Sequence, residues 1–291
     1  NLNGLKDTIL KQIGDLIQAP EGAYAPATLR AYYTDVQKFT AHCSARGLQP
    51  FPADADTVCD FVASQALELR PGSVRRCLCA IRKIQQLLRL LIPTAEEDVN
   101  LAMRGLRRTK LGRPRQAKGM TRAHLDKATP SSPTARGIAQ SALLSLGYDL
   151  LTRRSELVAL MTDGIEFRND GTLRVMIRRS KTDPFEMGRI ELTSRRSAQL
   201  VGEWLAWRGD GIAPLFCGIY RGRTINRSLD KTKVKLIVKA AVLAASRPPA
   251  EVAAFSSHSL RVGAAQELMC AGFDAAAIMR AGGWKSINNW L

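Results

Sequence analysis

The stretch His258-Ser-Leu-Arg261-Val-Gly-Ala-Ala, followed by Ala281-Gly-Gly-Trp284, decides how the rest of this chain is interpreted. His258 and Arg261 are three residues apart, so on a helix that begins near Ser256-Ser257 they share one face of its first turn. A helix N-terminus carries free N–H groups and a positive dipole end, where a phosphate binds favourably. A capping histidine and a core tryptophan would leave the same pattern, so the stretch alone predicts only a candidate phosphate site.

Length and charge indicate two domains and a polyanionic partner. Single hydrophobic cores seldom grow beyond the 291 residues of this chain, so two domains are expected. The net charge is +17, with 18 Lys and Arg against 11 Asp and Glu in residues 1–118, and 25 against 15 in the remainder. Because the excess is spread along the chain, both halves are expected to contact the same polyanion, with DNA or RNA as the leading candidate. A basic protein without a nucleic-acid role is the alternative.

Cysteine usage and hydropathy bear on location and on metals. The six cysteines form no CxxC pair and the three histidines do not cluster with them, so no zinc site is predicted. Reduced thiols on apolar helix faces are typical of a reducing compartment. No apolar run reaches membrane-spanning length, and the N-terminus lacks the pattern of a signal peptide. We therefore expect a cytoplasmic protein with no metal and no membrane partner.

Residues 1–106 are predicted to form helices only, as an N-terminal DNA-binding domain. The periodicity predicts helices over residues 5–17, from Pro26 to about Gly47, after the capping pair Asp54 and Asp56, and over residues 73–91. The last of these has an apolar stripe, and four basic side chains lie largely off it: Arg75, Arg76, Arg82 and Lys83. An α-helix fits the DNA major groove, so these are candidate DNA contacts. A solvated charged face on a core helix is an equally good interpretation.

Residues 107–119 are predicted to be a basic linker that follows a phosphate backbone, with Arg113, Arg115 and Lys118 as candidate contacts. Residues 120–291 are predicted to form a mixed α+β domain. Residues 172–178 alternate as a strand, residues 188–192 form a second strand, and the rest is mostly helix. A mainly α fold with a small antiparallel sheet results. The basic stretch from Arg221 through Arg223 to Lys231 is a further candidate DNA contact.

Two other motifs carry possible phosphate chemistry. Arg153-Arg154-Ser-Glu156 places a glutamate three residues after an arginine, which is either a helical ion pair or a phosphate clamp oriented by a carboxylate. Lys181 lies in the turn after the first predicted strand, where a lysine is ordinarily solvated. A lysine that reaches a phosphate site could instead donate a proton.

In this order and spacing the motifs resemble the tyrosine recombinase, or phage integrase, family. The resemblance implies a core-binding (SAM-like) first domain and a catalytic second domain that needs no metal or nucleotide cofactor. It implies that Arg153, with Arg154 as its rival, and Arg261 neutralise the scissile phosphate, while Glu156 orients the first arginine. Lys181 would protonate the leaving 5′ hydroxyl. His258 would bind the phosphate and assist proton transfer, and Trp284 would donate its indole N–H to a phosphate oxygen.

The resemblance also implies a tyrosine nucleophile nine positions after Trp284, two positions beyond Leu291. Because none of the five tyrosines follows Trp284, residues 1–291 alone are expected to be inactive in cleavage. The predicted function is site-specific recombination of double-stranded DNA through a 3′-phosphotyrosine. The full-length protein would form a homodimer on inverted-repeat sites and a homotetramer in synapsis. A non-catalytic DNA-binding regulator or a decayed recombinase is the alternative. A metal-dependent nuclease would need a carboxylate cluster that the sequence does not offer.

Overall fold

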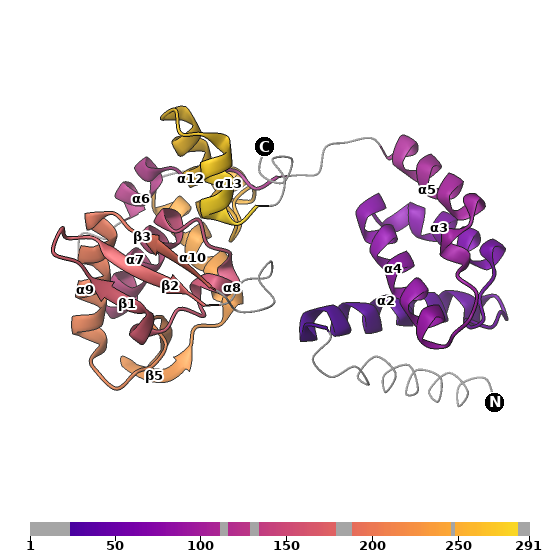
Figure 1. Ribbon diagram of the computed structural model, residues 1–291, viewed down its shortest axis with the longest axis horizontal. Coiled ribbons are helices and arrows are strands. Elements are labelled where there is room, and N and C mark those ends of the chain that lie inside the picture. The colour runs from indigo at the N-terminus through magenta and orange to yellow at the C-terminus, as the bar shows by residue number, and fades with distance from the viewer. Residues whose placement is uncertain (1–23, 111–115, 129–133, 179–187, 246–247, 285–291) are drawn as a thin grey trace. The chain divides into compact units, whose positions relative to one another are not determined.

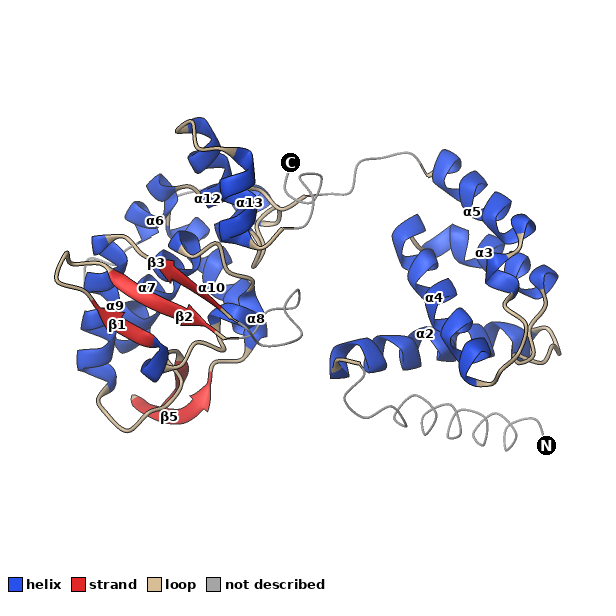
Figure 2. Ribbon diagram, viewed as in Figure 1, coloured by secondary structure: helices blue, strands red, loops and turns tan. Residues whose placement is uncertain are grey.

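The computed structural model describes residues 24–110, 116–128, 134–178, 188–245 and 248–284 (Figure 1). Its contacts divide the chain into two compact units, Asn1–Pro114 and Arg115–Leu291. In the described residues the first unit is built of helices, and strands occur only in the second (Figure 2). The mainly helical fold with small antiparallel sheets is therefore confirmed. None of the helices in this part of the chain combines the length and the apolar character needed to cross a bilayer.

The first unit contains the predicted helices from Pro26 onward, while the helix predicted over residues 5–17 lies outside the described residues. Proline opens two of the helices in their first turn, as its fixed φ allows. Asp54 caps another, accepting the Thr57 N–H at 2.8 Å. The elements are α2 (Pro26–Ala45), α3 (Ala55–Glu68), α4 (Pro71–Leu87), a 3₁₀ turn (Pro93–Ala95) and α5 (Glu97–Thr109).

The core of the first unit lies between two helix pairs, α2 with α4 and α3 with α5. Phe39 and Phe61 are fully buried and meet edge to face, with ring centroids 5.2 Å apart. The predicted apolar stripe of α4 supplies Val74 and Ile81 to the same cluster. Burial of this stripe fixes which face of α4 remains exposed.

The second unit wraps helices around a core that includes Leu146, Trp204 and Val238. Helix α7 is central, since it packs against both α9 and α12. The helices are α6 (Arg122–Ala128), α7 (Ala135–Asp149), α8 (Arg154–Leu157), α9 (Arg195–Arg208), α10 (Lys231–Ala244), α11 (Pro249–Val252), α12 (Ser259–Cys270) and α13 (Ala275–Gly282), with a 3₁₀ turn over Thr162–Gly164.

Two antiparallel sheets complete the second unit. The first has the order β1 (Ile165–Phe167), β2 (Leu173–Ile177) and β3 (Arg189–Leu192), of which β2 and β3 were predicted from the sequence. The second is a hairpin of β4 (Cys217–Tyr220) and β5 (Arg223–Ser228), which was not predicted from the sequence. Its turn residues Arg221 and Gly222 both have positive φ, 49° and 74°, which suits a tight hairpin turn.

The predicted linker contributes to both units. Arg107 and Arg108 lie in the last turn of α5, so the first residues of the stretch are helical. At its other end the Lys118 N–H donates to the Ala254 carbonyl at 3.0 Å, and the Met120 N–H donates to the Ser259 carbonyl at 2.8 Å. The segment that enters the second unit is therefore attached to the start of α12.

Candidate phosphate-binding site

A break between two helices creates the first half of the site. The sequence predicts mostly helix in this part of the chain, but α7 ends at Asp149 and Leu151 adopts a left-handed φ of 48°. Arg153 then takes the N-cap position of α8. Its backbone N–H donates to Glu156 Oε2 at 3.0 Å, and its Nη1 donates to Glu156 Oε1 at 2.7 Å. The carboxylate thus fixes both the helix start and the guanidinium.

Glu156 is ionised although its side chain is only 1% exposed. Burial raises the pKa of Glu156, but hydrogen bonds from Arg153 and the charges of Arg153 and Arg189 outweigh burial and leave this pKa below its usual range. The ion pair between Glu156 and Arg153 is therefore a buried feature of the fold. An exposed ion pair on a helix surface, by contrast, contributes little to stability.

Helix α12 supplies the second arginine. Arg261 is 4% exposed, and its guanidinium donates from Nη1 to the Leu151 carbonyl at 2.8 Å and from Nη2 to the Gly282 carbonyl at 2.5 Å. Burial, followed by the charge of Arg153, lowers the pKa of Arg261 to about 9, so the side chain remains a cation at neutral pH. Arg261, in the first turn of α12, thereby binds both the segment between α7 and α8 and the last residue of α13.

The Gly282-Gly283-Trp284 segment brings the two arginines together. Gly283 ends α13 with a left-handed φ of 63°, and its carbonyl accepts from Arg153 Nη2 at 3.0 Å. The Trp284 ring lies against the Arg261 guanidinium, 3.8 Å from carbon to centroid. A Cβ at position 282 would lie 1.9 Å from that ring, so glycine is required there. Arg153 and Arg261, far apart in sequence, thus bind adjacent carbonyls.

His258 precedes α12 and is exposed. Its backbone N–H donates to Ser256 Oγ at 3.1 Å, so Ser256 shapes the turn before the helix as a capping residue would. Desolvation lowers the pKa of His258, and the charges of Arg261, Arg154 and Arg153 lower it further. A neutral imidazole results at pH 7, which can accept a proton at one nitrogen and donate from the other.

The predicted site residues meet as follows. The contacts described above connect four of them: Arg153, Glu156, Arg261 and Trp284. The charges of both arginines lower the pKa of His258. Arg153, rather than its rival Arg154, carries the ion pair to Glu156. Lys181 lies outside the described residues. Sequence reasoning missed one residue, Arg189 on β3, whose Nη2 lies 3.6 Å from Glu156 Oε2.

On α4 the structure separates the four predicted DNA contacts. Arg75 and Arg82 are exposed and lie two helical turns apart on one face. Arg76 instead binds Asp35, which is fully buried, with Nε–Oδ2 at 2.6 Å and Nη2–Oδ1 at 2.9 Å. Lys83 lies over the Tyr24 ring at 5.1 Å. The buried carboxylate explains Arg76 without DNA, because an unpaired buried charge is costly.

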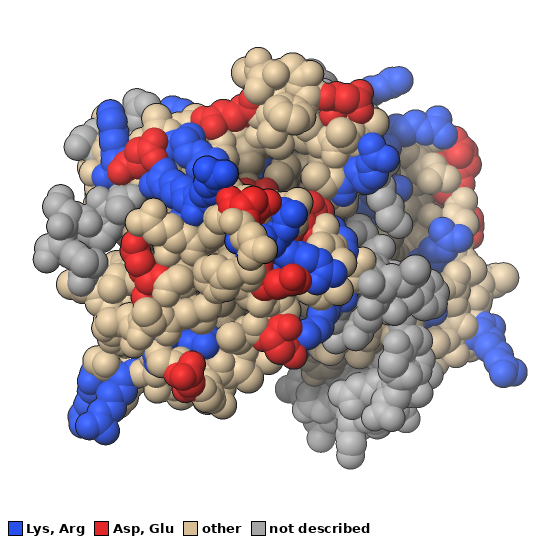
Figure 3. All heavy atoms as spheres, turned by 60° about the vertical axis from the view of Figure 1, so that its left-hand side comes forward, with Lys and Arg blue, Asp and Glu red and all other residues tan. Residues whose placement is uncertain are grey.

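The remaining predicted DNA contacts are at the surface of the second unit or outside the described residues. Arg221, Arg223 and Lys231 are exposed, at the β4–β5 turn and the start of α10. Lys118 is exposed and pairs with Glu251 at 2.9 Å. Arg113 and Arg115 lie outside the described residues. On the face shown in Figure 3, basic side chains gather in groups with acidic ones between them.

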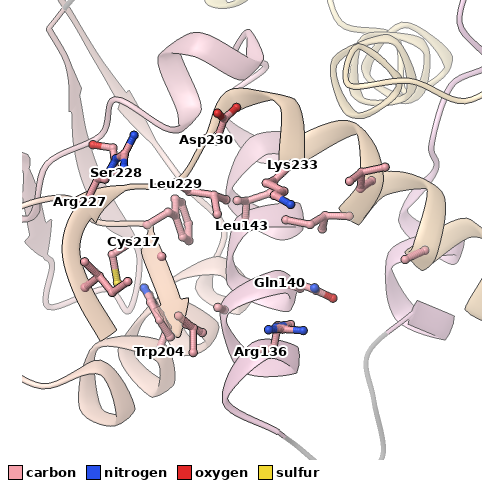
Figure 4. A pocket seen from close by; sticks show the side chains of 18 residues that line it. Arg136, Gln140, Leu143, Trp204, Cys217, Arg227, Ser228, Leu229, Asp230 and Lys233 are labelled. Carbon is pink, nitrogen blue, oxygen red and sulfur yellow. The ribbon is translucent and has the colours of Figure 1, made fainter. Parts of the chain in front are cut away.

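A separate cavity of about 600 Å³ lies between α7, α10 and the β4–β5 hairpin. In Figure 4, Gln140 and Leu143 from α7, Cys217 from β4 and Lys233 from α10 surround the same space. Its walls are mostly apolar, and of the predicted catalytic residues that the structure describes none lines it. The cavity and the arginine site are therefore distinct features of the second unit.

Two cationic arginines, a carboxylate bound to one of them and a neutral histidine make a candidate phosphate-binding site. In the described residues no three His, Cys, Asp or Glu side chains lie close enough to hold a metal ion. The sequence model of the phage integrase family matches residues 121–290, more than half of the chain. The chain belongs to the phage integrase family, which confirms the resemblance to tyrosine recombinases.

Relatives and solved structures agree with this assignment. The chain is 25% identical to the recombinase Cre of Escherichia phage P1, over 99% of this chain and 89% of that protein. It is 28% identical to an integrase/recombinase XerD homologue of Selenomonas ruminantium, over 89% and 79%. Among solved structures, XerH bound to difH before cleavage has a TM-score of 0.66 at 15% identity, covering 96% and 80%. A lambda integrase dimer on a core site has 0.62 at 14%, covering 99% and 75%. These two share the fold.

Proposed function

We propose that this protein is a site-specific DNA recombinase that cuts and rejoins double-stranded DNA through a 3′-phosphotyrosine intermediate. The observation that carries the proposal is the meeting of Arg153 and Arg261 at the adjacent carbonyls of Gly282 and Gly283. Two cations fixed at one point suit a phosphodiester whose charge grows in the transition state. Family membership supports the reaction type, and these contacts support the choice of residues.

In this reaction each side chain has a separate task. Arg153 and Arg261 would bind the two non-bridging oxygens of the scissile phosphate, and Glu156 would keep Arg153 in place. His258, neutral at pH 7, would accept the proton of the attacking tyrosine hydroxyl or donate to a phosphate oxygen. Trp284, which covers the face of Arg261, would shield the cation from water and offer its indole N–H to the phosphate.

The tyrosine oxygen would attack phosphorus while the 5′ oxygen leaves, and Lys181 would give that oxygen its proton. The covalent phosphotyrosine would conserve the energy of the broken bond, so that a 5′ hydroxyl can reverse the step without a nucleotide cofactor. The attacking group would be a tyrosine hydroxyl, as the resemblance to tyrosine recombinases implies.

For DNA binding we propose that the two units act together on the duplex. On α4, Gly72, Arg75, Cys79, Arg82 and Gln86 are all exposed and recur every three or four residues, as one face of a helix does. Arginine and glutamine are suited to guanine and adenine edges in the major groove. We further propose inverted-repeat sites, a homodimer on each site, a homotetramer in synapsis and a cytoplasmic location.

The test uses the full-length gene product and the DNA that flanks its own gene. Denaturing gels should show a covalent protein–DNA complex linked through a tyrosine to a 3′ phosphate. Arg153→Gln and Arg261→Gln should each lower its rate of formation about 10²–10³-fold, as loss of one charge-stabilising donor does. Exposed Arg174→Gln, with its ion pair to Glu166 on the outer face of the sheet, is the matched control.

Two other results would change the conclusion. Specific DNA binding by the full-length protein with no covalent complex would favour the non-catalytic regulator or decayed recombinase. Tyrosine-linked DNA formed by residues 1–291 alone would place the nucleophile elsewhere. In either case affinity should fall steeply with salt. Arg75→Gln or Arg82→Gln should each cost about 1–3 kcal/mol of binding free energy and relax the sequence preference, as expected for base-reading residues.

A further inference from the structure

Strand β3 turns its charged side chains towards the core and its apolar side chains towards solvent. It pairs with β2 so that Arg189 lies opposite Ile177 and Glu191 opposite Val175, two residues of the buried core. The side chains of Arg189 and Glu191 are only 19% and 23% exposed. Ile190 and Leu192, which hydrophobicity would bury, are instead 46% and 55% exposed on the outer face.

Such an inversion carries a free-energy cost, because two apolar side chains stay in water while two charges approach the core. A one-residue shift of register would reverse it. Gly188 precedes the strand with a φ of +68°, and a Cβ there would lie 3.1 Å from the Ile177 carbonyl oxygen, so glycine suits this close approach. A strand that keeps charged residues inward at such a cost is more often shaped by a site than by stability.

The inward charges continue the ion pair of the phosphate site. Glu191 Oε1 lies 3.2 Å from Arg189 Nε, and Arg189 Nη2 lies 3.6 Å from Glu156 Oε2. Glu156 Oε1 in turn accepts from Arg153 Nη1 at 2.7 Å. Charges alternate along this row, from β3 to the arginine proposed to bind the phosphate. Arg189 Nη2 also reaches the Leu150 carbonyl at 3.5 Å, beside the Leu151 carbonyl that holds Arg261.

We infer that Arg189 is a positioning residue for the proposed reaction: it holds the Glu156 carboxylate in the orientation that fixes Arg153, with Glu191 as its own counter-ion. The inference rests on the proposed function, since it assigns Arg189 to the same site. Arg189 acts through Glu156 and Arg153, and the phosphate itself is bound by Arg153 and Arg261.

Three cations face Glu156, from three elements: Arg153 at the start of α8, Arg189 on β3 and Arg261 on α12. Loss of Arg189 leaves the buried carboxylate with less positive charge around it. The pKa of Glu156 should then rise, and protonation would release Arg153 from its hydrogen bond. Arg189→Gln should therefore be most harmful at the acidic end of the pH range.

The experiment compares full-length wild type with Arg189→Gln, Arg189→Lys and the outer-face control Arg174→Gln. The first measurement is the ¹³C carboxyl titration of Glu156, assigned with Glu156→Gln. The second is the single-turnover rate of covalent-complex formation across pH, with the Kd for DNA. In metal sites, loss of a residue that orients a metal ligand lowers metal affinity or activity about 10–100-fold. By analogy we expect the single-turnover rate to fall by a factor of that order in Arg189→Gln, with Kd changed less than about threefold.

The Glu156 titration should move to higher pH in Arg189→Gln, return towards wild type in Arg189→Lys, and stay unchanged in Arg174→Gln. An unmoved titration in Arg189→Gln overturns the inference whatever the rate. A wild-type rate in Arg189→Gln overturns it as well, because the carboxylate would then not need this partner. Failure of the wild type itself to form a covalent complex would count against the proposed function, while the titration would still decide the role of Arg189.

Discussion

Gly263→Ala should destabilise the second unit because the added methyl group has no space. Gly263 lies on α12 two residues after Arg261, and its Cβ would stand 1.9 Å from the Met120 carbonyl oxygen and 2.5 Å from its carbonyl carbon. Both contacts are to backbone, which cannot rotate away. Hydrogen bonds from Lys118 and Met120 attach this backbone to Ala254 and Ser259, so it cannot retreat without breaking them.

The expected loss combines two costs and one gain. Forcing a methyl group into a packed interior costs roughly 1–3 kcal/mol. Loss of the Met120–Ser259 hydrogen bond adds about 1 kcal/mol. Alanine gains about 1 kcal/mol over glycine within a helix. We therefore expect the free energy of unfolding to fall by about 1–3 kcal/mol, since these terms combine only approximately.

The matched control is Gly202→Ala on α9 of the same unit. There a Cβ would meet only ring carbons of Phe167, at 3.7 and 3.8 Å, which is ordinary contact. Its stability should stay level or rise by up to about 1 kcal/mol. All four tryptophans, at positions 204, 207, 284 and 290, belong to the second unit, so urea titration followed by tryptophan fluorescence reports on that unit. Equal stabilities of the two variants would refute the close-approach argument.

Three further predictions concern charge and exposure. Arg76→Leu should lower the stability of the first unit by roughly 1–3 kcal/mol, which is less than for a fully buried pair because Arg76 is half exposed. Arg75→Leu should leave that stability unchanged in circular dichroism melts. Equal losses in the two variants would contradict the pairing of Arg76 with Asp35. DNA should protect Cys79 from alkylation but not exposed Cys270, read by mass spectrometry, and equal labelling with and without DNA would remove α4 from the interface. Arg154→Gln should raise the pKa of His258 in an NMR titration and leave His42 unmoved. Because the fold depresses the His258 pKa, the unfolded state takes up the proton first and stability falls as pH drops below about 6.5, a fall that Arg154→Gln should lessen.

Much of the fold follows from local signals. Pro26 and Gly47 bracket a helix that the structure places at Pro26–Ala45, and Asp54 caps the next as predicted. The break at residues 150–153 could not be predicted, since leucine rarely adopts the positive φ seen at Leu151. Its carbonyl binds Arg261, a residue more than a hundred positions later, so tertiary contacts accompany a conformation that local preference disfavours.

Some residues of the candidate site could likewise be predicted from the sequence, and others could not. Motif order is enough to select Arg153, Glu156, Arg261 and Trp284, and the structure connects them. Arg189 belongs to no recognisable motif, because its inward orientation depends on the register of β3 against β2. Arg75 and Arg76 are neighbours of one residue type, and only the buried Asp35 distinguishes them. Residues that act through tertiary pairing stay hidden until the fold is known.

Backbone carbonyls allow several arginines to lie close together without cancelling their positive charge. Arg153, Arg189 and Arg261 lie within electrostatic reach of one another, and together they contact the carbonyls of Leu150, Leu151, Gly282 and Gly283. Carboxylates in those four places would stabilise the cations but repel a phosphate. Carbonyl dipoles offset the repulsion between the arginines while adding no net charge. With Glu156 paired to Arg153 and Glu191 to Arg189, the three arginines still carry more charge than the two carboxylates. The positive potential that remains is what the proposed binding of a phosphodiester would need.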